Sequence, residues 1–344
     1  MKKILIINLG GVGDMLFSVP FLRGLRAKYK KDEITLFTVV NSCKIIANQR
    51  YFDKVVEIPA GSGDIRRLSA LKYLKVLLAL RKERYDLVVN LRTVVSFFSA
   101  LKVVIILFII RAEKTAGKGN ALVRFIYDYA VAEKTEYKKH EIDYHAELAE
   151  KIGFKAVGKS SIKLDRSNLS FASKFLSKNK INSKNKLIVV NHEARWQTRR
   201  WPLSGYIKLF DKLLKKKDVK IAVNCDKDIA SELIIKKIFK KVVIIKTNDI
   251  RNLAAVIKRA SLLLSNDTGV LHMGAAQNIK TLGLYGSTDP FLTAPYLPVE
   301  RKRELYKHLP CSPCNKMTCS SRACFKEITA EEVYSAIIKL LGVR

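Results

Sequence analysis

One stretch late in the chain, Ser265–Pro290 (SNDTGVLHMGAAQNIKTLGLYGSTDP), constrains the fold more than any other. The apolar run Ser261–Leu264 before it has the length of a strand, and Asn266–Gly269 interrupts it with turn and helix-capping residues. Small and apolar residues then predict a short helix, and Thr281–Tyr285 predicts a second buried strand. We therefore expect a helix N-terminus at the carboxyl edge of a sheet, where unpaired N–H groups and the helix dipole favour an anion.

Four residues at the start of this predicted helix are candidates for contact with the anion: Asp267, Thr268, Gly269 and His272. Thr268 is expected to cap the helix with its hydroxyl, and Gly269 would let a ligand approach the backbone. His272, one turn into the helix, could donate a hydrogen bond to the same anion or to a sugar hydroxyl. The alternative is that His272 is a structural histidine.

The full pattern, N-D-T-G-x-x-H-x-x-A-A followed by an apolar strand and G-S-T-D-P, closely resembles the signature of glycosyltransferase family 9, the ADP-heptose:lipopolysaccharide heptosyltransferases. The resemblance is strongest at Leu253–Pro290, good at 1–20 and 190–202, and loose at 115–165. It implies an α/β protein of GT-B architecture, with two Rossmann-like doubly wound domains facing a central cleft. It also implies inverting transfer of a heptose or similar sugar from a nucleoside-diphosphate donor, without a cofactor or a catalytic metal.

The N-terminus carries the second motif. Lys3–Asn8 predicts a buried strand, the helix should follow at Met15–Tyr29, and between them lies a turn containing Gly10, Gly11 and Gly13. The glycine spacing is not G-x-G-x-x-G, and no acidic residue ends the next predicted strand, so dinucleotide binding is not expected. The heptosyltransferase family carries G-D-x5-P at this place, matched here by Gly13-Asp14 and Pro20.

Asp14 is the candidate catalytic residue. It follows a glycine turn at the carboxyl end of the first predicted strand, so its carboxylate could face a cleft and take the proton of an attacking sugar hydroxyl. The alternative is that Asp14 caps the helix. The residues alone favour capping, whereas the family resemblance implies the base.

Asn191–Pro202 (NHEARWQTRRWP) is the third motif, following the first strand of the second half. The family has a basic residue two positions before Trp-Pro, which is Arg199 here, and a guanidinium suits the diphosphate that leaves. Trp201 is expected to be structural. By position, Asp228 is the candidate for contact with the nucleoside and Asp226 is the second choice. The Asp226–Asp228 pattern also occurs in metal-dependent glycosyltransferases.

The order of predicted elements gives the domain organisation. Strands and helices alternate through two successive series, which is typical of two doubly wound domains. Ile162–Lys186 is polar and is the best candidate for the junction, whereas Arg111–Gly119 is predicted to be a loop. We expect an acceptor-side domain at 1–165, a nucleotide-sugar-binding domain at 166–327 and a closing helix at 328–344.

Val94–Ile110 is the most apolar run of the chain. It is slightly short for a membrane span, and Lys102 interrupts it. We expect a helix packed in the core, with a face resting on a bilayer as the alternative. The preceding helix is predicted at Ile65–Lys82. Further along the first half, Phe125–Tyr144 and the residue after it hold candidates for the acceptor side: Tyr127, Tyr129, Tyr137, His140 and His145.

Four of the six cysteines gather near the C-terminus, at Cys311, Cys314, Cys319 and Cys324. In a cytosolic protein such clustering favours a structural metal over disulfides. The spacing departs from paired C-x2-C, and a loop of reduced thiols is the slightly favoured alternative.

The net charge of the chain indicates which partners to expect. The formal net charge is +33, which points to anionic partners. The lysines are scattered along predicted helices without interleaved aromatic residues, so nucleic acid is not expected. We expect a nucleotide-sugar donor, an anionic glycolipid or glycan acceptor, and peripheral contact with a membrane surface. The first apolar run is too short for a signal peptide, so a cytoplasmic protein at the inner face of the membrane is expected.

Two other functions fit the same residues. One is another GT-B-type enzyme, such as a sugar-nucleotide epimerase or a glycosyltransferase for a different acceptor. The other is a non-catalytic, basic membrane- or RNA-binding protein on the same fold. A scaffold would need none of Asp14, Arg199 and His272, so their presence together favours an enzyme.

Overall fold

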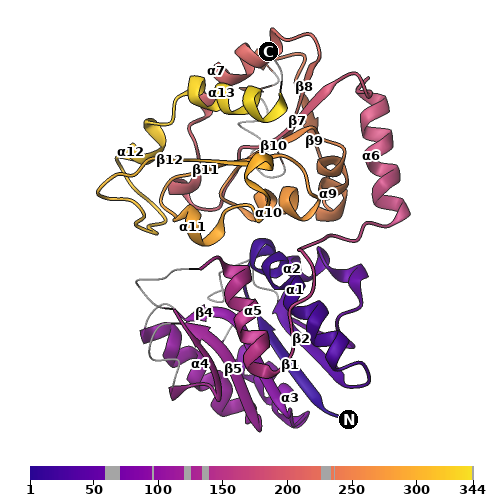
Figure 1. Ribbon diagram of the computed structural model, residues 1–344, viewed down its shortest axis with the longest axis vertical. Helices are drawn as coiled ribbons and strands as arrows, with labels where there is room; N and C mark the ends of the chain where they lie inside the picture. The colour runs from indigo at the N-terminus through magenta and orange to yellow at the C-terminus, as the bar shows by residue number, and fades with distance from the viewer. Residues whose placement is uncertain are drawn as a thin grey trace. The chain divides into compact units, whose positions relative to one another are not determined.

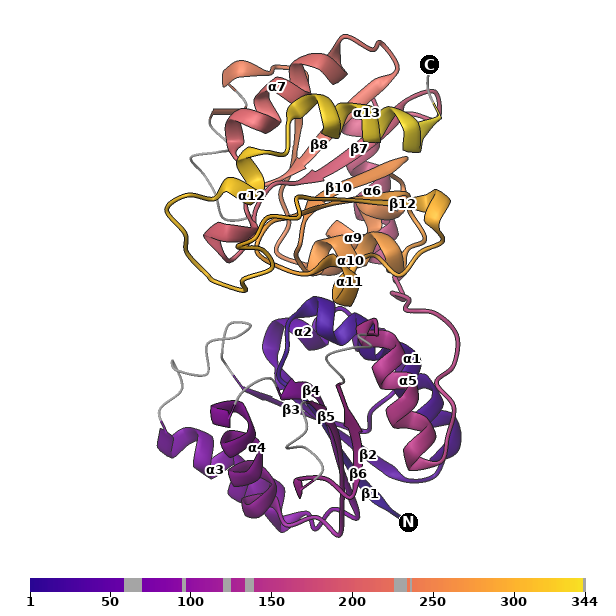
Figure 2. The same cartoon turned by 60° about the vertical axis from the view of Figure 1, so that its left-hand side comes forward.

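The computed structural model describes residues 1–58, 70–94, 97–119, 125–133, 139–225, 234–235 and 237–342. The chain divides into two compact units, Met1–Ser161 and Ile162–Arg344. Each unit is a parallel sheet with helices on both faces (Figures 1 and 2). The C-terminal segment predicted as a separate closing helix belongs to the second unit.

The first sheet has six strands, all parallel, in the order β3-β2-β1-β4-β5-β6. Its central strands are apolar because helices cover both faces: β1 reads KILIIN and is buried from its second residue onward. The strands are β1 (Lys3–Asn8), β2 (Glu33–Val39), β3 (Lys54–Ile58), β4 (Leu87–Val94), β5 (Lys114–Gly119) and β6 (Tyr129–Ala132).

The second sheet also has six parallel strands, in the order β12-β11-β10-β7-β8-β9. They are β7 (Lys186–Asn191), β8 (Val219–Asn224), β9 (Val243–Ile245), β10 (Leu262–Asn266), β11 (Thr281–Tyr285) and β12 (Lys302–Tyr306). Counted from the first strand of its own unit, each sheet has the strand order of a dinucleotide-binding, doubly wound fold. This confirms the predicted α/β class with two Rossmann-like units.

The strand order fixes where a ligand would bind in each unit. In doubly wound sheets, ligands bind outside the carboxyl ends of the strands at the point where the strand order reverses. That point lies between β1 and β4 in the first unit and between β7 and β10 in the second. The three predicted site motifs directly follow β1, β7 and β10.

In the first unit, α3 and α4 lie on one face of the sheet, and α1 and α5 lie on the other (Figure 2). Helix α5 illustrates the local rules: its N-cap is His140, two acidic residues in its first turn complement the dipole, and Gly153 ends it at φ 90°. The described helical segments are α1 (Val12–Lys28), α2 (Val40–Lys44), η1 (Ala47–Gln49), α3 (Ala70–Lys82), α4 (Phe97–Ile110) and α5 (Glu141–Ile152).

In the second unit, α7 and α13 pack on one face of the sheet, and Val333 and Ile337 of α13 enter its core. Helices α6, α9 and α10 lie on the other face (Figure 1). The described helical segments are α6 (Arg166–Lys178), η4 (Gln197–Arg199), α7 (Leu203–Leu214), α9 (Ile250–Lys258), α10 (Gly269–Ala276), α11 (Pro290–Thr293), η5 (Val299–Arg301), α12 (Ala323–Lys326) and α13 (Ala330–Leu341).

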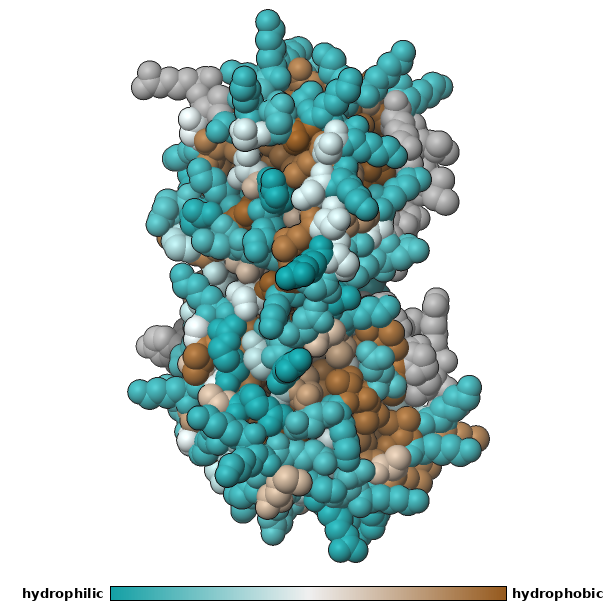
Figure 3. Space-filling view, turned by 90° about the vertical axis from the view of Figure 1, so that its right-hand side faces the viewer, coloured by the Kyte–Doolittle hydropathy of each residue, from teal (hydrophilic) through white to brown (hydrophobic). Residues whose placement is uncertain are grey.

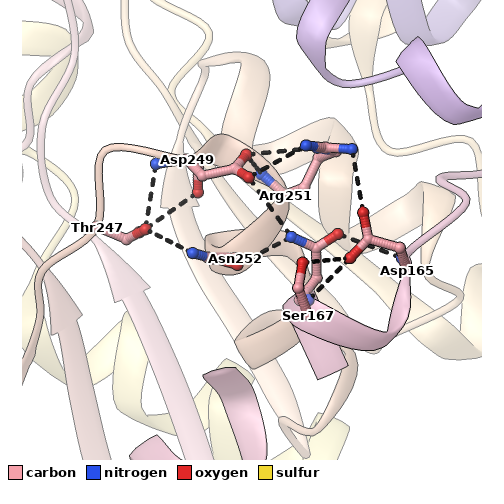
Figure 4. Close-up of polar contacts among 7 residues, drawn as sticks. Asp165, Ser167, Thr247, Asp249, Arg251 and Asn252 are labelled. Atoms are coloured by element: carbon pink, nitrogen blue, oxygen red, sulfur yellow. Dashed lines mark hydrogen bonds and ion pairs between the residues drawn. The ribbon is translucent and has the colours of Figure 1, made fainter. Parts of the chain in front are cut away.

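A polar clasp joins the start of α6 to the start of α9 (Figure 4). Asp165 caps α6 by accepting from the Asn168 N–H at 3.0 Å. The Arg251 guanidinium lies 3.4 Å from Asp165 and 3.3 Å from Asp249. The Asn168 amide donates to Asn252 Oδ1 at 2.9 Å. The start of the predicted junction at Ile162–Lys186 is therefore anchored within the second unit, which begins at Ile162.

Three strands, β5, β6 and β12, are absent from the sequence-based prediction, and the loop predicted at Arg111–Gly119 is wrong because it contains β5. Two contacts explain the error. Lys118 is fully buried and forms ion pairs with Glu133, at 3.4 Å, and with Glu141. A Cβ at Gly117 would lie 2.3 Å from Tyr127 Cζ, so only glycine leaves room for that ring.

Helix α4 also differs from its prediction. The core helix expected at Val94–Ile110 begins at Phe97, and only Ala100 and Ile110 are buried within it. Among the described residues, no helix combines the length and the apolar character needed to cross a bilayer.

Candidate functional site

The structure places Asp14 in the helix that follows the first strand of the first unit and Asp267 directly after β10 of the second. In the first unit, Asp14 lies in the first turn of α1, directly after the glycine turn. Its Oδ2 accepts from the Gly11 N–H at 2.6 Å. A Cβ at Gly10 would lie 2.5 Å from Asp14 Oδ2, so a larger residue would displace the carboxylate. None of Gly10, Gly11 and Gly13 is among the described glycines with positive φ. Glycine is therefore required at position 10 by the close approach of the Asp14 side chain and not by backbone conformation.

Asp14 also has an unusual electrostatic environment. Its side chain is open to solvent. Nevertheless, burial among the surrounding protein atoms raises the pKa of its carboxyl, and the charge of Glu141 adds to this effect. The Gly11 N–H, Arg92 and His145 oppose it. An accessible carboxylate with a raised pKa is suited to accept a proton.

Asn8, at the end of β1, holds the glycine turn in place. Its Oδ1 accepts from the Gly10 N–H at 3.2 Å, and its Nδ2 donates to the Asp14 carbonyl at 3.4 Å. The Ser42 hydroxyl donates to the Gly10 carbonyl at 2.7 Å. The sequence analysis missed Asn8, although a polar residue ending an apolar strand before a functional loop is a usable signal.

Glu141, whose charge acts on Asp14, is partly buried and pairs with the fully buried Lys118. Burial works to raise the pKa of the Glu141 carboxyl, but the adjacent Lys118 ammonium, together with His145 and His140, lowers it below the ordinary value. The Lys118 Nζ also lies 4.8 Å from the centre of the Tyr144 ring. A lysine buried in this way cannot be read from the sequence, because its partners lie 15 and 23 residues away.

The acceptor-side candidates divide into groups. His145 is buried, and its ring nitrogens lie 3.2 Å from the Phe17 carbonyl and 3.1 Å from the Leu91 carbonyl. Burial and the charge of Lys118 lower the pKa of His145. We interpret it as a link between α1, β4 and α5. His140 accepts from the Ile142 N–H as a helix cap at 3.1 Å. Tyr127 is buried, and its hydroxyl accepts from Asn90 at 2.7 Å.

Tyr129 lies on β6, which places it in the first sheet. Tyr137 lies outside the described residues.

In the second unit, α10 begins after Thr268, as predicted, but the expected hydrogen bond is wrong. In the described part of the chain, the Thr268 side chain makes no capping bond to α10. Its Oγ1 instead accepts from Asn191 Nδ2 at 3.2 Å and lies 3.3 Å from Ser265 Oγ. The Thr268 hydroxyl therefore does not accept from the first N–H groups of α10, and these groups are suited to bind an anion.

Asp267, the residue after β10, and Arg199, the last residue of η4, come together. The Arg199 Nη1 lies 3.3 Å from Asp267 Oδ2, and the carboxylate is buried. The Thr288 hydroxyl donates to the same oxygen at 2.6 Å. The Arg199 guanidinium lies 4.0 Å from the centre of the Trp196 ring. Asp267 therefore orients the arginine, and the Arg199 side chain remains 27% exposed.

Asparagines end three neighbouring strands of the second sheet: β7 at Asn191, β8 at Asn224 and β10 at Asn266. The Asn224 amide donates to Asn191 Oδ1 at 2.9 Å. Asn266 donates to the His192 carbonyl at 2.6 Å and accepts from the Trp201 N–H at 3.2 Å. The sequence analysis did not single out this row, although Asn at the last position of successive apolar strands was visible.

The remaining predicted residues are placed as follows. His272 is buried at 5% exposure, which limits how much of its ring a ligand could reach. Trp201 is structural, as expected: it is buried, and its Nε1 donates to the Ile328 carbonyl at 2.9 Å. Asp226 and Asp228 lie outside the described residues.

The four clustered cysteines are present as free thiols. Within the described ranges, no three His, Cys, Asp or Glu side chains come together as a metal ion would require. The Cys319 Sγ accepts from the Arg322 N–H at 3.5 Å, and this backbone bond lowers the pKa of the thiol. Metal binding by this segment stays an untested prediction.

Comparisons with known proteins agree with this fold. A model of glycosyltransferase family 9 (heptosyltransferase) matches residues 73–324, more than half of the chain. The chain is 22% identical to the lipopolysaccharide core heptosyltransferase OpsX of Haemophilus influenzae over 317 residues, which covers 89% of this chain and 85% of that protein.

Two solved structures share the fold. A glycosyl transferase family 9 protein from Veillonella parvula superposes with a TM-score of 0.75 at 20% identity, covering 99% of this chain and 97% of that one. The ADP-heptose lps heptosyltransferase II of E. coli superposes with a TM-score of 0.71 at 18% identity, covering 98% of each chain.

Proposed function

Because the chain belongs to glycosyltransferase family 9, the heptosyltransferases, we propose that it transfers a heptose or a similar sugar from ADP-heptose to a lipopolysaccharide-core or related glycan acceptor. The names of two relatives support this choice. OpsX is a lipopolysaccharide core heptosyltransferase, and the E. coli enzyme is named for ADP-heptose. The observation that carries the proposal is the accessible carboxylate of Asp14, with its raised pKa, at the switch point of the first sheet.

In the proposed reaction, the Asp14 carboxylate accepts the proton of the acceptor hydroxyl. The hydroxyl oxygen attacks the anomeric carbon of the donor, and a new glycosidic C–O bond forms. The bond from that carbon to the diphosphate oxygen breaks, and its electron pair leaves with the nucleoside diphosphate. One displacement inverts the anomeric centre and needs a single base, in contrast to a double displacement with a carboxylate nucleophile.

The second unit would stabilise the leaving group. Arg199 is held by Asp267 and Trp196, so its partly exposed guanidinium can meet a diphosphate without reorganising. The N–H groups at the start of α10, beside Thr268 and Gly269, would bind the same phosphates. This cationic cradle makes a catalytic metal unnecessary in the proposed mechanism. Asp228 is proposed to contact the nucleoside and His272 the sugar.

The test uses purified protein, ADP-heptose and a heptose-free lipopolysaccharide core, with EDTA present. We expect the acceptor mass to increase by one heptosyl unit and one ADP to be released per transfer. Nucleoside diphosphates alone should raise the melting temperature in EDTA. Isomerised donor in the absence of acceptor would instead indicate an epimerase. Strict dependence on Mg²⁺ or Mn²⁺ would contradict the metal-free cradle.

Because a lipopolysaccharide acceptor lies at a membrane, the proposal includes peripheral contact of the protein with the membrane surface. The transfer reaction itself does not identify the surface that makes this contact.

A further inference from the structure

Hydrophobic side chains gather on one flank of the first unit (Figure 3). They come from α3 and α4, which pack beside each other on the same face of the sheet. We call these residues the α3–α4 surface: Leu71, Leu74, Leu78, Phe97, Phe98, Leu101, Val104, Ile105 and Phe108. Phe98 and Phe108 are 73% and 71% exposed. An apolar side chain of that size left in water forfeits the favourable transfer that burial would give.

The spacing of the exposed apolar residues along α4 shows that they form a single surface. On α4 the exposed residues recur every three or four positions from Phe97 to Phe108, which makes one continuous stripe along the helix. The opposite stripe, including Ile106 and Leu107, packs against the core of the first unit. Helix α4 therefore packs one apolar side against the core and exposes a second apolar side to solvent.

The charges beside the α3–α4 surface have one sign. Neither α3 nor α4 contains Asp or Glu. Five exposed basic residues lie on these helices: Lys72, Lys75, Arg81, Lys82 and Lys102. Such side chains extend their apolar stems along a hydrophobic surface and place the charge in an anionic headgroup layer.

We infer that the α3–α4 surface docks the protein onto a bilayer containing anionic lipid, with both helices lying in the plane of the interface. Apolar residues on one side with basic residues beside them, and no acidic residues on either helix, match the chemistry of interfacial helices. At 14 residues, α4 is about 21 Å long, which is shorter than the ~30 Å hydrocarbon core, so it lies on the bilayer rather than across it. A second copy of the chain is a poor occupant, because two molecules of charge +33 repel one another.

Vesicle flotation tests this inference, and it is separate from the proposed transfer reaction because the assay contains neither donor nor acceptor. Wild-type protein should bind vesicles of equal parts phosphatidylglycerol and phosphatidylcholine, and bind vesicles of pure phosphatidylcholine far more weakly. The variant Phe98→Ser/Phe108→Ser should reduce binding at least ten-fold. Its melting temperature should not fall, because the two rings are mostly exposed. Phe291→Ser, which removes a 60%-exposed ring from the second unit, is the matched control and should bind as the wild type does.

The charge contribution is tested separately. Lys72→Gln/Lys75→Gln should weaken binding by about five-fold per lysine, and the loss should shrink at high salt. The matched control is Lys217→Gln/Lys240→Gln, which removes the same charge from exposed positions of the second unit. Wild-type affinity in the phenylalanine variant would overturn the inference. So would equal binding to neutral vesicles, or a wild-type dimer in light scattering that the phenylalanine substitutions dissociate.

Discussion

The two units have the same strand order, yet the carboxyl edges of their sheets carry opposite chemistry. In the first unit the acid, Asp14, is exposed and a cation, Lys118, is fully buried and paired with Glu141. In the second unit the acid, Asp267, is buried and the partly exposed group is a cation, Arg199. The shared topology therefore sets the sheet edge at which a ligand would bind, and a few side chains determine whether that edge presents an acid or a cation.

The largest effect is expected at Asp14. Asp14→Asn retains an oxygen that can accept from the Gly11 N–H but removes the basicity, so kcat should fall by about 10²–10⁴-fold. Donor affinity and melting temperature should stay near the wild-type values. Asp165→Asn changes a capping carboxylate of the second unit in the same way and should leave kcat unchanged. If Asp14→Asn mainly lowered stability, Asp14 would be a helix cap.

The next effect concerns Lys118. Lys118→Met leaves the Glu141 carboxylate without its buried partner and should lower the free energy of unfolding by about 3–5 kcal/mol. Lys114→Met is the matched control on the same strand, because Lys114 pairs with Asp128 at the surface and should contribute far less. Chemical denaturation of both variants gives the comparison. Equal losses would show that burial of Lys118 is energetically unimportant.

Arg199 tests the second edge. Arg199→Gln should lower kcat by roughly 10²-fold, because one positioned donor to the leaving group is lost. Arg199→Lys keeps the charge and should recover much of the rate. Arg195→Gln, at an exposed position four residues earlier, is the control and should be near wild type. Steady-state kinetics with the donor varied would separate kcat from KM. Unchanged kcat in Arg199→Gln would remove this residue from the phosphate site.

The smallest effect is a shift in pH dependence. The base must be deprotonated, so kcat/KM should rise with pH through the pKa of Asp14. Because burial raises that pKa, the acid limb should lie above the range of an ordinary carboxyl. Glu141→Gln removes a charge that raises the pKa further, so the limb should move to lower pH. A shift to higher pH would contradict the assignment of this limb to Asp14.

Local patterns predicted much of this molecule. Residues 3–8 and 281–285 are strands as predicted, because a fully buried strand in a parallel sheet is recognisable by composition. Strand β5 was not predictable, because Lys118 and Gly117 belong there only once Glu141 and Tyr127 are beside them. Long-range pairing overrides local propensity at such positions.

In the candidate site, too, local features were predictable and long-range contacts were not. The sequence placed Thr268 at the N-cap of α10, since capping is a local rule. It could not show that the Thr268 hydroxyl turns to Asn191, which is 77 residues away. The apolar character of α4 was equally visible, but which of its sides meets the core depends on tertiary packing.

The clasp between α6 and α9 has a practical consequence. All its residues, from Asp165 to Asn252, belong to the second unit, so a polypeptide starting at Ile162 would keep its first helix capped and docked. Such a half-molecule would carry Arg199, Asp267 and the start of α10 without Asp14. Nucleotide binding could then be measured by itself, on a fragment that lacks the carboxylate proposed as the base.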